Sequence, residues 1–419
     1  MKSFPPHSFA ALVAVILVAT PPSKAAEGGG SAPSPDLLLG DGPEVAQARV
    51  RLSHGDADLA ALVRILVGDA NSVLNSPIAS IVDKAYTPPS GDKHDYFSLA
   101  PYWWPNPQTA DRLPYVWRDG VSNPERGAFD YPKLVSMTRA VTILGPAYYY
   151  TGDERYAENA AQRLRVWFLD PATRMNPNLK YCQVRRGQHS RGRGSSIEAI
   201  RFRWLVDAVV LLRGSPHWTA ADDRALRDWF GNLARWMATS PDAIAESASA
   251  NNHGSWYAEQ VVDYALFAGD TKLAREQLSG IAPRILSQIM PDGTEPHELT
   301  RTKALHYSNF NNLGLLDLVR LGRRLDAAIA ASDSEAGLRL RCSLAHLAPY
   351  VTGTAIWRHQ QTKSLDYSQI AETYWIAAAT DPDPSLAGVL DCLPGGARPP
   401  VYVQLMLPLS QSVARPPHR

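Results

Sequence analysis

Two short segments of the chain combine the side chains that removal of a proton next to a carboxylate requires. Residues 251–257 read NNHGSWY and include Asn252 and His253, whereas residues 301–307 read RTKALHY and include Arg301 and Tyr307. A carbanion beside a carboxylate forms only when the carboxylate charge is neutralised while a base reaches the carbon. An amide and a guanidinium suit the first task, and an imidazole or a phenol suits the second.

Each segment also has a purely structural explanation. Residues 251–253 directly precede the apolar ladder of a helix, where asparagine is a common cap. Arg301 and Tyr307 are six residues apart, so in one continuous helix they would lie on faces about 120° apart. They could still flank one cleft. His306 and the polar residues 308–312 would need partners on a buried helix face, and this crowding favours a site.

Tyrosine is an informative residue in such a set. A phenol has an ordinary pKa of about 10 and is a poor base at neutral pH unless positive charge stabilises the phenolate, which Arg301 with His253 or His306 could do. We predict no metal site, because no His-Glu-x-x-His or Cys-x-x-Cys motif occurs. The three cysteines after the N-terminal region have no metal-type spacing and permit at most one disulfide.

Composition limits the class of protein. The chain has 419 residues, of which 45% are hydrophobic and 20% charged, which is enough for a large core. The net charge of +1 excludes a globally basic nucleic-acid binder. A polyanionic ligand would therefore have to bind to local clusters of arginine and lysine.

The N-terminal region has the pattern of a secretory signal. Lys2 is followed by an apolar stretch at 9–19 and by small residues before position 26. We therefore predict a signal peptide over 1–25, a flexible linker over 26–40, a catalytic domain over 41–408 and a tail over 409–419. The mature protein is expected in the periplasm or outside the cell, without membrane association after cleavage.

Helical periodicity dominates the remainder of the chain. Apolar residues recur at three- and four-residue steps over 134–148, Gly152 ends that helix, and Asp153 can cap the next one. The same pattern returns at Gly269, and Thr219 begins a capping box. Paired helices predict an all-α fold, and only residues 401–406 read as a strand.

Two irregular segments have an unusual composition. Residues 96–107 are rich in aromatic residues and proline, and Trp103 and Trp104 either stack on sugar rings or plug the core. Residues 185–196 concentrate arginines, including Arg191 and Arg193, but lack the ending of a phosphate-binding loop. Arginine forks suit rows of carboxylates, and a solvated basic loop is the alternative.

These motifs together resemble a known family. Asn252-His253, Arg301 and Tyr307, with residues 102–107 (YWWPNP), are similar to the alginate-lyase-like superfamily and most closely to polysaccharide lyase family thirty-eight, which includes glucuronan and poly-mannuronate lyases. The similarity runs from about residue 96 to about residue 369. It implies an (α/α) toroid and syn β-elimination of β-1,4-linked polyuronates, with glucuronan slightly favoured over poly-mannuronate and no cofactor.

The resemblance also implies roles for individual residues. Asn252 and Arg301 would neutralise the C5 carboxylate of the bound uronate, His253 would assist or act as base, and Tyr307 would deliver a proton to the leaving O4. Whether His253 or Tyr307 is the initial base stays open. Expected substrate-binding residues are Trp103, Trp104, Arg191, Arg193, Glu198, Asn251 and His306.

Two other classes of protein remain as alternatives. A glycoside hydrolase with an α/α barrel would use two carboxylates, for which Asp95, Glu198 and Glu298 are candidates. A non-catalytic periplasmic protein that binds uronans would use the same tryptophans and arginines. It would have no need for a phenol beside the Asn-His pair.

Overall fold

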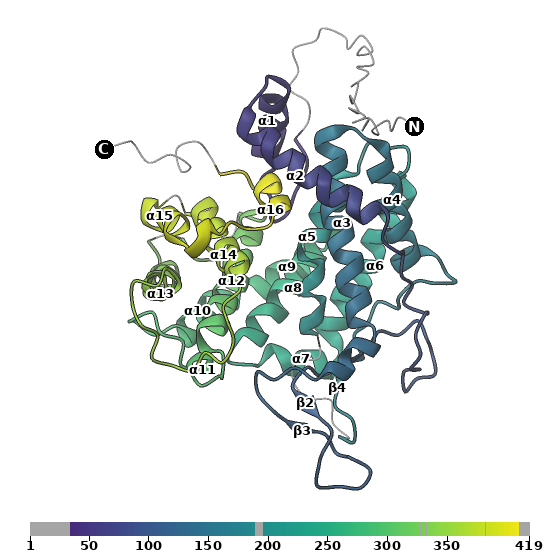
Figure 1. Cartoon of the computed structure of the whole chain (residues 1–419), viewed down its shortest axis with the longest axis vertical. Coiled ribbons are helices and arrows are strands. Elements are labelled where there is room, and N and C mark those ends of the chain that lie inside the picture. Colours follow the sequence, from purple (N-terminus) through teal and green to yellow (C-terminus); the bar gives the residue numbers. More distant parts are fainter. Residues whose placement is uncertain (1–33, 189–195, 327–328, 332, 382, 410–419) are drawn as a thin grey trace, which may run out of the picture. The chain divides into compact units, whose positions relative to one another are not determined.

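Helices form most of the structure, and the strands are short (Figure 1). The computed structural model describes residues 34–188, 196–326, 329–331, 333–381 and 383–409. The α-helices are α1 Gly42–Ser53, α2 Ala57–Leu74, α3 Tyr131–Thr151, α4 Glu154–Leu164, α5 Arg203–Leu211, α6 Ala220–Thr239, α7 Pro241–Ser247, α8 Asn252–Ala268, α9 Thr271–Leu278, α10 Ile281–Gln288, α11 Pro296–Leu299, α12 Ala304–Arg323, α13 Glu335–Val351, α14 Tyr367–Thr380, α15 Pro384–Cys392 and α16 Val401–Met406. The strands are β1 Phe97–Leu99, β2 Trp103–Trp104, β3 Val116–Trp117 and β4 Tyr181–Val184, and short helical turns lie at η1 Pro124–Ala128, η2 Arg165–Leu169, η3 Ile197–Phe202 and η4 Pro394–Gly396.

The predicted helical hairpins are confirmed by their caps. Helix α3 ends at Gly152, whose φ of 71° is a conformation that glycine adopts without strain, and Asp153 then caps α4. Helix α8 ends in the same way at Gly269. Thr219 and Asp222 form the predicted capping box of α6.

The hairpins are arranged as an α/α toroid, as predicted (Figure 1). Helices α3, α5, α8, α12 and α14 pack successively against one another on the inside. Helix α4 packs on α3, α6 and α9 pack on α8, α13 packs on α12, and α15 packs on α14. This alternation of an inner and an outer helix follows from the hairpin repeat, since each hairpin buries one face against the next.

Helices α8 and α12 are buried on nearly every side, which places them at the centre of the toroid. They approach closely where Gly314 of α12 faces Trp256 of α8, because a Cβ atom at Gly314 would lie 3.0 Å from the indole ring. The Trp256 indole N–H donates to the carbonyl of Phe310 at 3.1 Å. Both helices begin at the same end of the toroid, where the predicted site residues lie.

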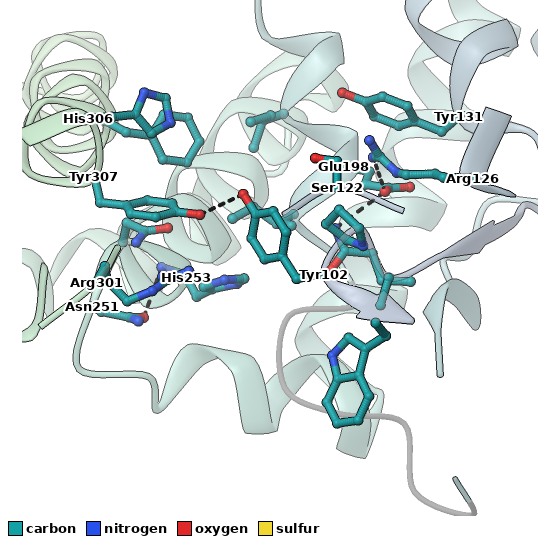
Figure 2. A pocket seen from close by; sticks show the side chains of 18 of the residues that line it. Tyr102, Ser122, Arg126, Tyr131, Glu198, Asn251, His253, Arg301, His306 and Tyr307 are labelled. Carbon is teal, nitrogen blue, oxygen red and sulfur yellow. Dashed lines mark hydrogen bonds and ion pairs between the residues drawn. The ribbon is translucent and has the colours of Figure 1, made fainter. Parts of the chain in front are cut away.

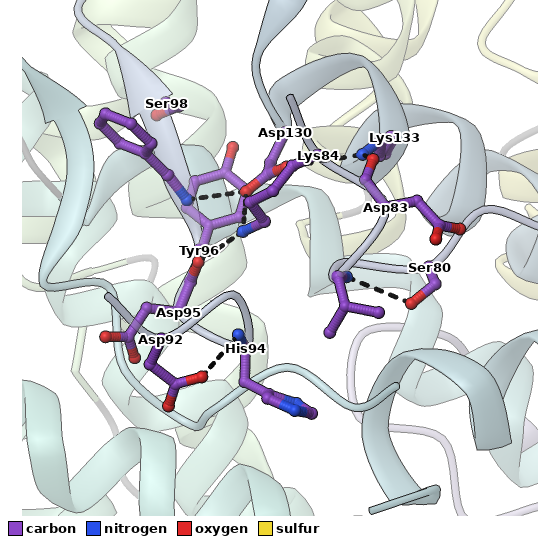
Figure 3. Close-up of polar contacts among 12 residues, drawn as sticks. Ser80, Asp83, Lys84, Asp92, His94, Asp95, Tyr96, Ser98, Asp130 and Lys133 are labelled. Atoms are coloured by element: carbon purple, nitrogen blue, oxygen red, sulfur yellow. Dashed lines mark hydrogen bonds and ion pairs between the residues drawn. The ribbon is translucent and has the colours of Figure 1, made fainter. Parts of the chain in front are cut away.

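Short strands and a buried ion pair organise the aromatic segment at that end. Strand β1 pairs in parallel with β4, and β2 pairs antiparallel with β3 so that Trp103 lies opposite Trp117. The Lys84 ammonium donates to Asp130 at 2.5 Å and to the carbonyl of Asp95 at 2.6 Å (Figure 3). Asp130 also accepts the N–H of Phe97 at 2.9 Å, so the start of α3 holds β1 in place.

Two expectations about the chain ends need correction. The linker predicted for 26–40 is too long, because Leu37 and Leu39 are buried in the core and Asp207 binds the backbone of residues 38–40. Residues 401–406, which read as a strand, form helix α16, because packing on α1, α2 and α3 outweighs the β-propensity of a six-residue segment. The predicted signal peptide lies outside the described residues.

In the described part of the chain, no helix combines the length and the apolar character that crossing a bilayer requires.

Asp207 offers a test of how the N-terminal segment is held. Its carboxylate accepts the N–H groups of Leu38, Leu39 and Gly40 at 2.6, 3.0 and 2.7 Å, and it is fully buried. Asp207→Asn replaces one acceptor oxygen with an N–H₂ group, so at least one buried N–H loses its partner. We expect the free energy of unfolding in urea to fall by about 1–3 kcal/mol. Asp228→Asn, at an exposed position of α6, is the control, and an equal effect of both changes would contradict this role.

Candidate functional site

A cavity of about 690 Å³ lies where α8 and α12 begin, between these helices and the β2–β3 segment (Figure 2). It brings together eight of the predicted site residues, which are Trp103, Glu198, Asn251, Asn252, His253, Arg301, His306 and Tyr307. Trp104 is not among the residues that line it. Arg191 and Arg193 lie outside the described residues.

A pair of phenols forms the centre of the cavity. The hydroxyl groups of Tyr307 and Tyr102 are 2.7 Å apart (Figure 2). The Lys303 ammonium donates to the Tyr102 oxygen at 2.9 Å. Since the Tyr102 oxygen accepts from Lys303, its own hydrogen is free to be donated to Tyr307. This chain of donors ends on the Tyr307 oxygen and stabilises negative charge there.

Arg301 lies against the face of Tyr307. Its guanidinium carbon is 3.9 Å from the centre of the phenol ring. Asp119 holds the guanidinium through Nη2 at 2.8 Å and also accepts the N–H of Thr302 at 3.0 Å. Because α12 begins only at Ala304, Arg301 precedes the helix, and the separation of about 120° expected for a continuous helix does not apply.

Burial sets the protonation state of Tyr307. The side chain is only 6% exposed, and this burial raises its pKa well above the ordinary value. The positive charge of Arg301 acts in the opposite direction. In the unliganded protein at neutral pH, Tyr307 is therefore a protonated phenol, ready to act as an acid.

His253 is oriented by a buried carboxylate. Its Nδ1 lies 3.0 Å from Glu246 Oε1, and Glu246 is fully buried. The second oxygen of Glu246 accepts the backbone N–H of Ser196 at 2.9 Å. A carboxylate beside Nδ1 favours the tautomer with hydrogen on Nδ1, which leaves the Nε2 lone pair available as a base.

Asn252 is held by a different buried carboxylate. Its side-chain nitrogen lies 2.9 Å from both oxygens of Glu298, and its backbone N–H donates to the same group at 2.6 Å. The two N–H bonds of the Asn252 amide diverge by more than the angle that the two Glu298 oxygens span at the nitrogen. Glu298 therefore accepts only one of the two amide hydrogens, and the second stays available to another acceptor. Asn251 caps α8 by accepting the N–H of His253 at 3.2 Å, as the sequence predicts.

His306 does not carry the charge that the sequence allowed for. Burial, together with the charge of Lys303, lowers its pKa from the ordinary value of 6.5 to about 4. Its ring stacks on Phe310 with the centroids 5.9 Å apart. The imidazole is neutral at physiological pH, so His306 does not stabilise a phenolate by charge.

Glu198 lies at the cavity wall, with its hydrogen-bonding capacity fully used. Its oxygens accept from Arg126 at 2.5 Å and from the hydroxyls of Tyr96 and Ser98, each at 2.6 Å, and the side chain is 4% exposed. Contact of Glu198 with substrate stays a prediction. This carboxylate positions Arg126, whose guanidinium carbon lies 3.3 Å from the centre of the Tyr131 ring.

The two predicted tryptophans have different environments. Trp103 lines the cavity, with the guanidinium carbon of Arg185 4.4 Å from its ring centre. Trp104 instead donates its indole N–H to the carbonyl of Val121 at 2.8 Å, which is a structural role. Trp117, which pairs with Trp103 across β2 and β3, is 58% exposed and lines the cavity, although the sequence analysis did not select it.

Sequence reasoning missed the residues that support the site from behind. Tyr102 is the first residue of the motif 102–107 that carries the resemblance, and this position was the only sequence feature that could have indicated a role in the site. Asp119 had no such signal, because it lies far from Arg301 in the sequence, and Glu246 lies close to His253 in the sequence but contacts it only through the turn between α7 and α8. The expectation that the polar run after Tyr307 belongs to the site needs correction for Asn311 and Asn312, which bind Gln288 of α10 and Ser343 of α13 in the core.

No group of three or more metal-ligating side chains occurs in the part of the chain that the structure describes. The carboxylates near the cavity each bind a guanidinium, an amide or an imidazole instead. This site offers its own cations and N–H groups to an anionic ligand.

Comparison with known proteins gives both a family and similar solved structures. The family model described as alginate lyase matches residues 80–357. An alginate lyase from Bacteroides ovatus is 36% identical, with a TM-score of 0.82 over 90% of this chain and 100% of that one. Two tetrasaccharide complexes of alginate lyase A1-III from Sphingomonas species A1, one of a histidine-to-alanine and one of a tyrosine-to-phenylalanine variant, are 16% identical, with a TM-score of 0.55 over 90% of this chain and 98% of theirs, which is a likeness of fold. A search of curated proteins found no match.

The neutral state of His306 predicts a pH dependence of stability. The unfolded chain takes up a proton near pH 6.5, whereas folded His306 takes one up only near pH 4. Since the unfolded state binds more protons between these values, the free energy of unfolding should fall by up to about 3 kcal/mol as the pH drops from 7 to 4. His306→Gln should lose this part of the fall in urea titrations. His54→Gln, at an exposed histidine, is the control, and unchanged curves for His306→Gln would refute the assignment.

Proposed function

The chain belongs to the alginate lyase family and is a polysaccharide lyase, and we propose that it cleaves β-1,4-linked polyuronates by syn β-elimination. The observation that carries this proposal is the Tyr307–Tyr102 phenol pair, with Arg301 against one ring and His253 in the same cavity. These groups supply a base, an acid and a cation without a pair of free carboxylates. The products would carry an unsaturated uronate at the new end.

Arg301 and Asn252 bind the substrate carboxylate and offset its negative charge. Asp119 occupies Nε and Nη2 of Arg301, so Nη1 stays available to bind a ligand carboxylate. The second N–H of Asn252 is the other donor. Both groups are fixed by carboxylates before substrate binds, so little reorganisation is needed when charge develops at C5 and its carboxylate.

We assign the base to His253 and the acid to Tyr307. His253 Nε2 removes the C5 proton, the electron pair forms the C4=C5 double bond, and the C4–O4 bond breaks. Tyr307 gives its proton to the departing O4 and is left as a phenolate, which Arg301 and the Lys303–Tyr102 chain stabilise. In β-1,4-linked mannuronate and glucuronate the C5 hydrogen and O4 lie on the same side, so base and acid can act from one cavity.

The proposed substrate is glucuronan, slightly favoured over poly-mannuronate. The two sugars differ only at C2, and the preference for glucuronan rests on the resemblance of the sequence motifs. The relative from Bacteroides ovatus is described as an alginate lyase, which makes poly-mannuronate a necessary test substrate. The N-terminal pattern of residues 1–25 supports a periplasmic or secreted location.

The hydrolase alternative lacks its two carboxylates in this cavity. Among the described residues that line it, the only acidic one is Glu198, whose oxygens are already occupied. Asp95 does not line the cavity and binds Ser90, Asn176 and Asn178. Glu298 lies behind Asn252.

The direct test is ultraviolet absorbance during incubation of the mature protein with glucuronan, poly-mannuronate and poly-guluronate in separate cuvettes. A rise reports the C4=C5 double bond, and the polymer that gives it identifies the sugar. New reducing ends without absorbance would support the hydrolase. Binding without either signal would support the non-catalytic protein.

Tyr307→Phe should abolish turnover, because no proton can reach O4, while substrate still binds. We expect kcat to fall by about 10²–10⁴-fold with KM changed less than twofold. Tyr86→Phe, at a half-exposed tyrosine that stacks on Phe129, is the matched control. A Tyr307→Phe variant with near-normal kcat would remove the proposed acid.

Glu246→Gln tests the base. A glutamine side chain has one acceptor oxygen, so it cannot serve both His253 Nδ1–H and the N–H of Ser196. We expect kcat to fall about 10²-fold because His253 loses its fixed tautomer. The matched control is Glu158→Gln on the surface of α4. If kcat matched the control, Tyr307 would have to act as both base and acid.

A further inference from the structure

The catalytic cavity continues into a second one on the side of α14 and α16. This second cavity has a volume of about 520 Å³ and is bordered by α2, α3, α5, α12, α14 and α16. The two cavities share Ile200, Arg201, Phe310 and Gln369. Phe310 is three residues after Tyr307 on α12, a rise of about 4.5 Å, so the second cavity opens directly beside the phenol pair.

Two arginines in this second cavity have no carboxylate partner among the described residues. Arg201 donates to the Tyr131 hydroxyl at 2.9 Å, and Arg139 makes no side-chain hydrogen bond within the described part of the chain. Both side chains are exposed. Arg203, by contrast, is neutralised by Asp317 at 2.6 Å and by Glu372 at 2.5 Å.

Other groups complete the wall of the second cavity. The Tyr402 hydroxyl makes no hydrogen bond to a described residue. Burial and the Glu372 carboxylate raise the pKa of Tyr402, whereas the charges of Arg203, Arg201 and Arg139 act to lower it. Arg398 also lines the cavity and is paired with Asp391 at 3.0 Å. Asp69 is the remaining acidic residue of the lining without an ion-pair partner in the described part of the chain.

We propose that the second cavity binds the polyuronate chain beyond the cleaved linkage, with Arg201 and Arg139 pairing with carboxylates of successive uronate residues. This inference rests on the proposed function for the class of ligand. A polyuronate carries one carboxylate on every sugar, and guanidinium forks bind carboxylates in a fixed orientation. The open Tyr402 hydroxyl suits the sugar hydroxyl groups between them. Substrates long enough to reach Arg139 should therefore bind more tightly than short ones.

Arg139 is the residue to change, because it is exposed on α3 and lines only the second cavity. Equilibrium binding is measured by calorimetry in a Tyr307→Phe background, so that turnover does not interfere. We expect Arg139→Ala to weaken binding of the polyuronate about tenfold, the loss of one charge-assisted contact. Binding of a uronate trisaccharide should weaken less than twofold. Arg139→Lys should restore most of the polymer affinity, and Arg224→Ala on α6 removes the same charge away from both cavities.

Three outcomes would overturn the inference: polymer affinity unchanged in Arg139→Ala, an equal loss for trisaccharide and polymer, or an equal loss in Arg224→Ala. The proposed function fails separately. If the unmodified protein releases no unsaturated product while its polymer affinity still depends on Arg139, the binding surface stands and the lyase chemistry does not. Failure of any polyuronate to bind would reject both.

Discussion

The close packing of α8 on α12 is the constraint on which the site depends. Trp256 lies against Gly314, where a Cβ atom would be only 3.0 Å from the indole, and its N–H binds the Phe310 carbonyl. This contact fixes how far one helix can slide along the other. Because Asn252 and His253 lie one turn before Trp256, and Tyr307 lies one turn before Phe310, the same contact fixes the relative position of the proposed base and acid.

Buried carboxylates then orient the individual side chains. Glu298 holds Asn252, Glu246 holds His253, and Asp119 holds Arg301, each through hydrogen bonds of 2.8–3.0 Å. A buried charge is costly unless it is paired, so each carboxylate restricts its partner to one arrangement. Asn252, His253 and Arg301 line the cavity, whereas the carboxylates that hold them do not. An anionic polymer therefore meets donors and cations first.

The phenol pair has two opposing electrostatic influences. Burial favours the neutral form of Tyr307, whereas Arg301 and the donor chain from Lys303 favour its anion. Such a phenol stays protonated in the free protein, and its phenolate is stabilised once the proton has been transferred to a leaving oxygen. A protein that only binds uronans would need the Tyr307 phenol for recognition alone. Recognition does not require Arg301, Tyr102 and Lys303 to converge on one phenol.

The sequence by itself determined the helical hairpins, because periodicity and caps such as Gly152 and Thr219 act locally. It also indicated Asn252, His253, Arg301 and Tyr307, whose residue types and motif context suit the proposed chemistry. Only the tertiary structure decided that Tyr102 and Asp119 support them, since partners more than a hundred residues apart, such as Asp119 and Arg301, have no local signature. Glu246 lies near His253 in the sequence, but the turn between α7 and α8 decides that the two side chains meet. The tertiary structure likewise decided that the Glu198 oxygens are occupied by hydrogen bonds, that His306 is neutral and that the Trp104 indole binds the Val121 carbonyl. Burial and hydrogen-bond partners depend on how the segments pack and not on spacing along the chain.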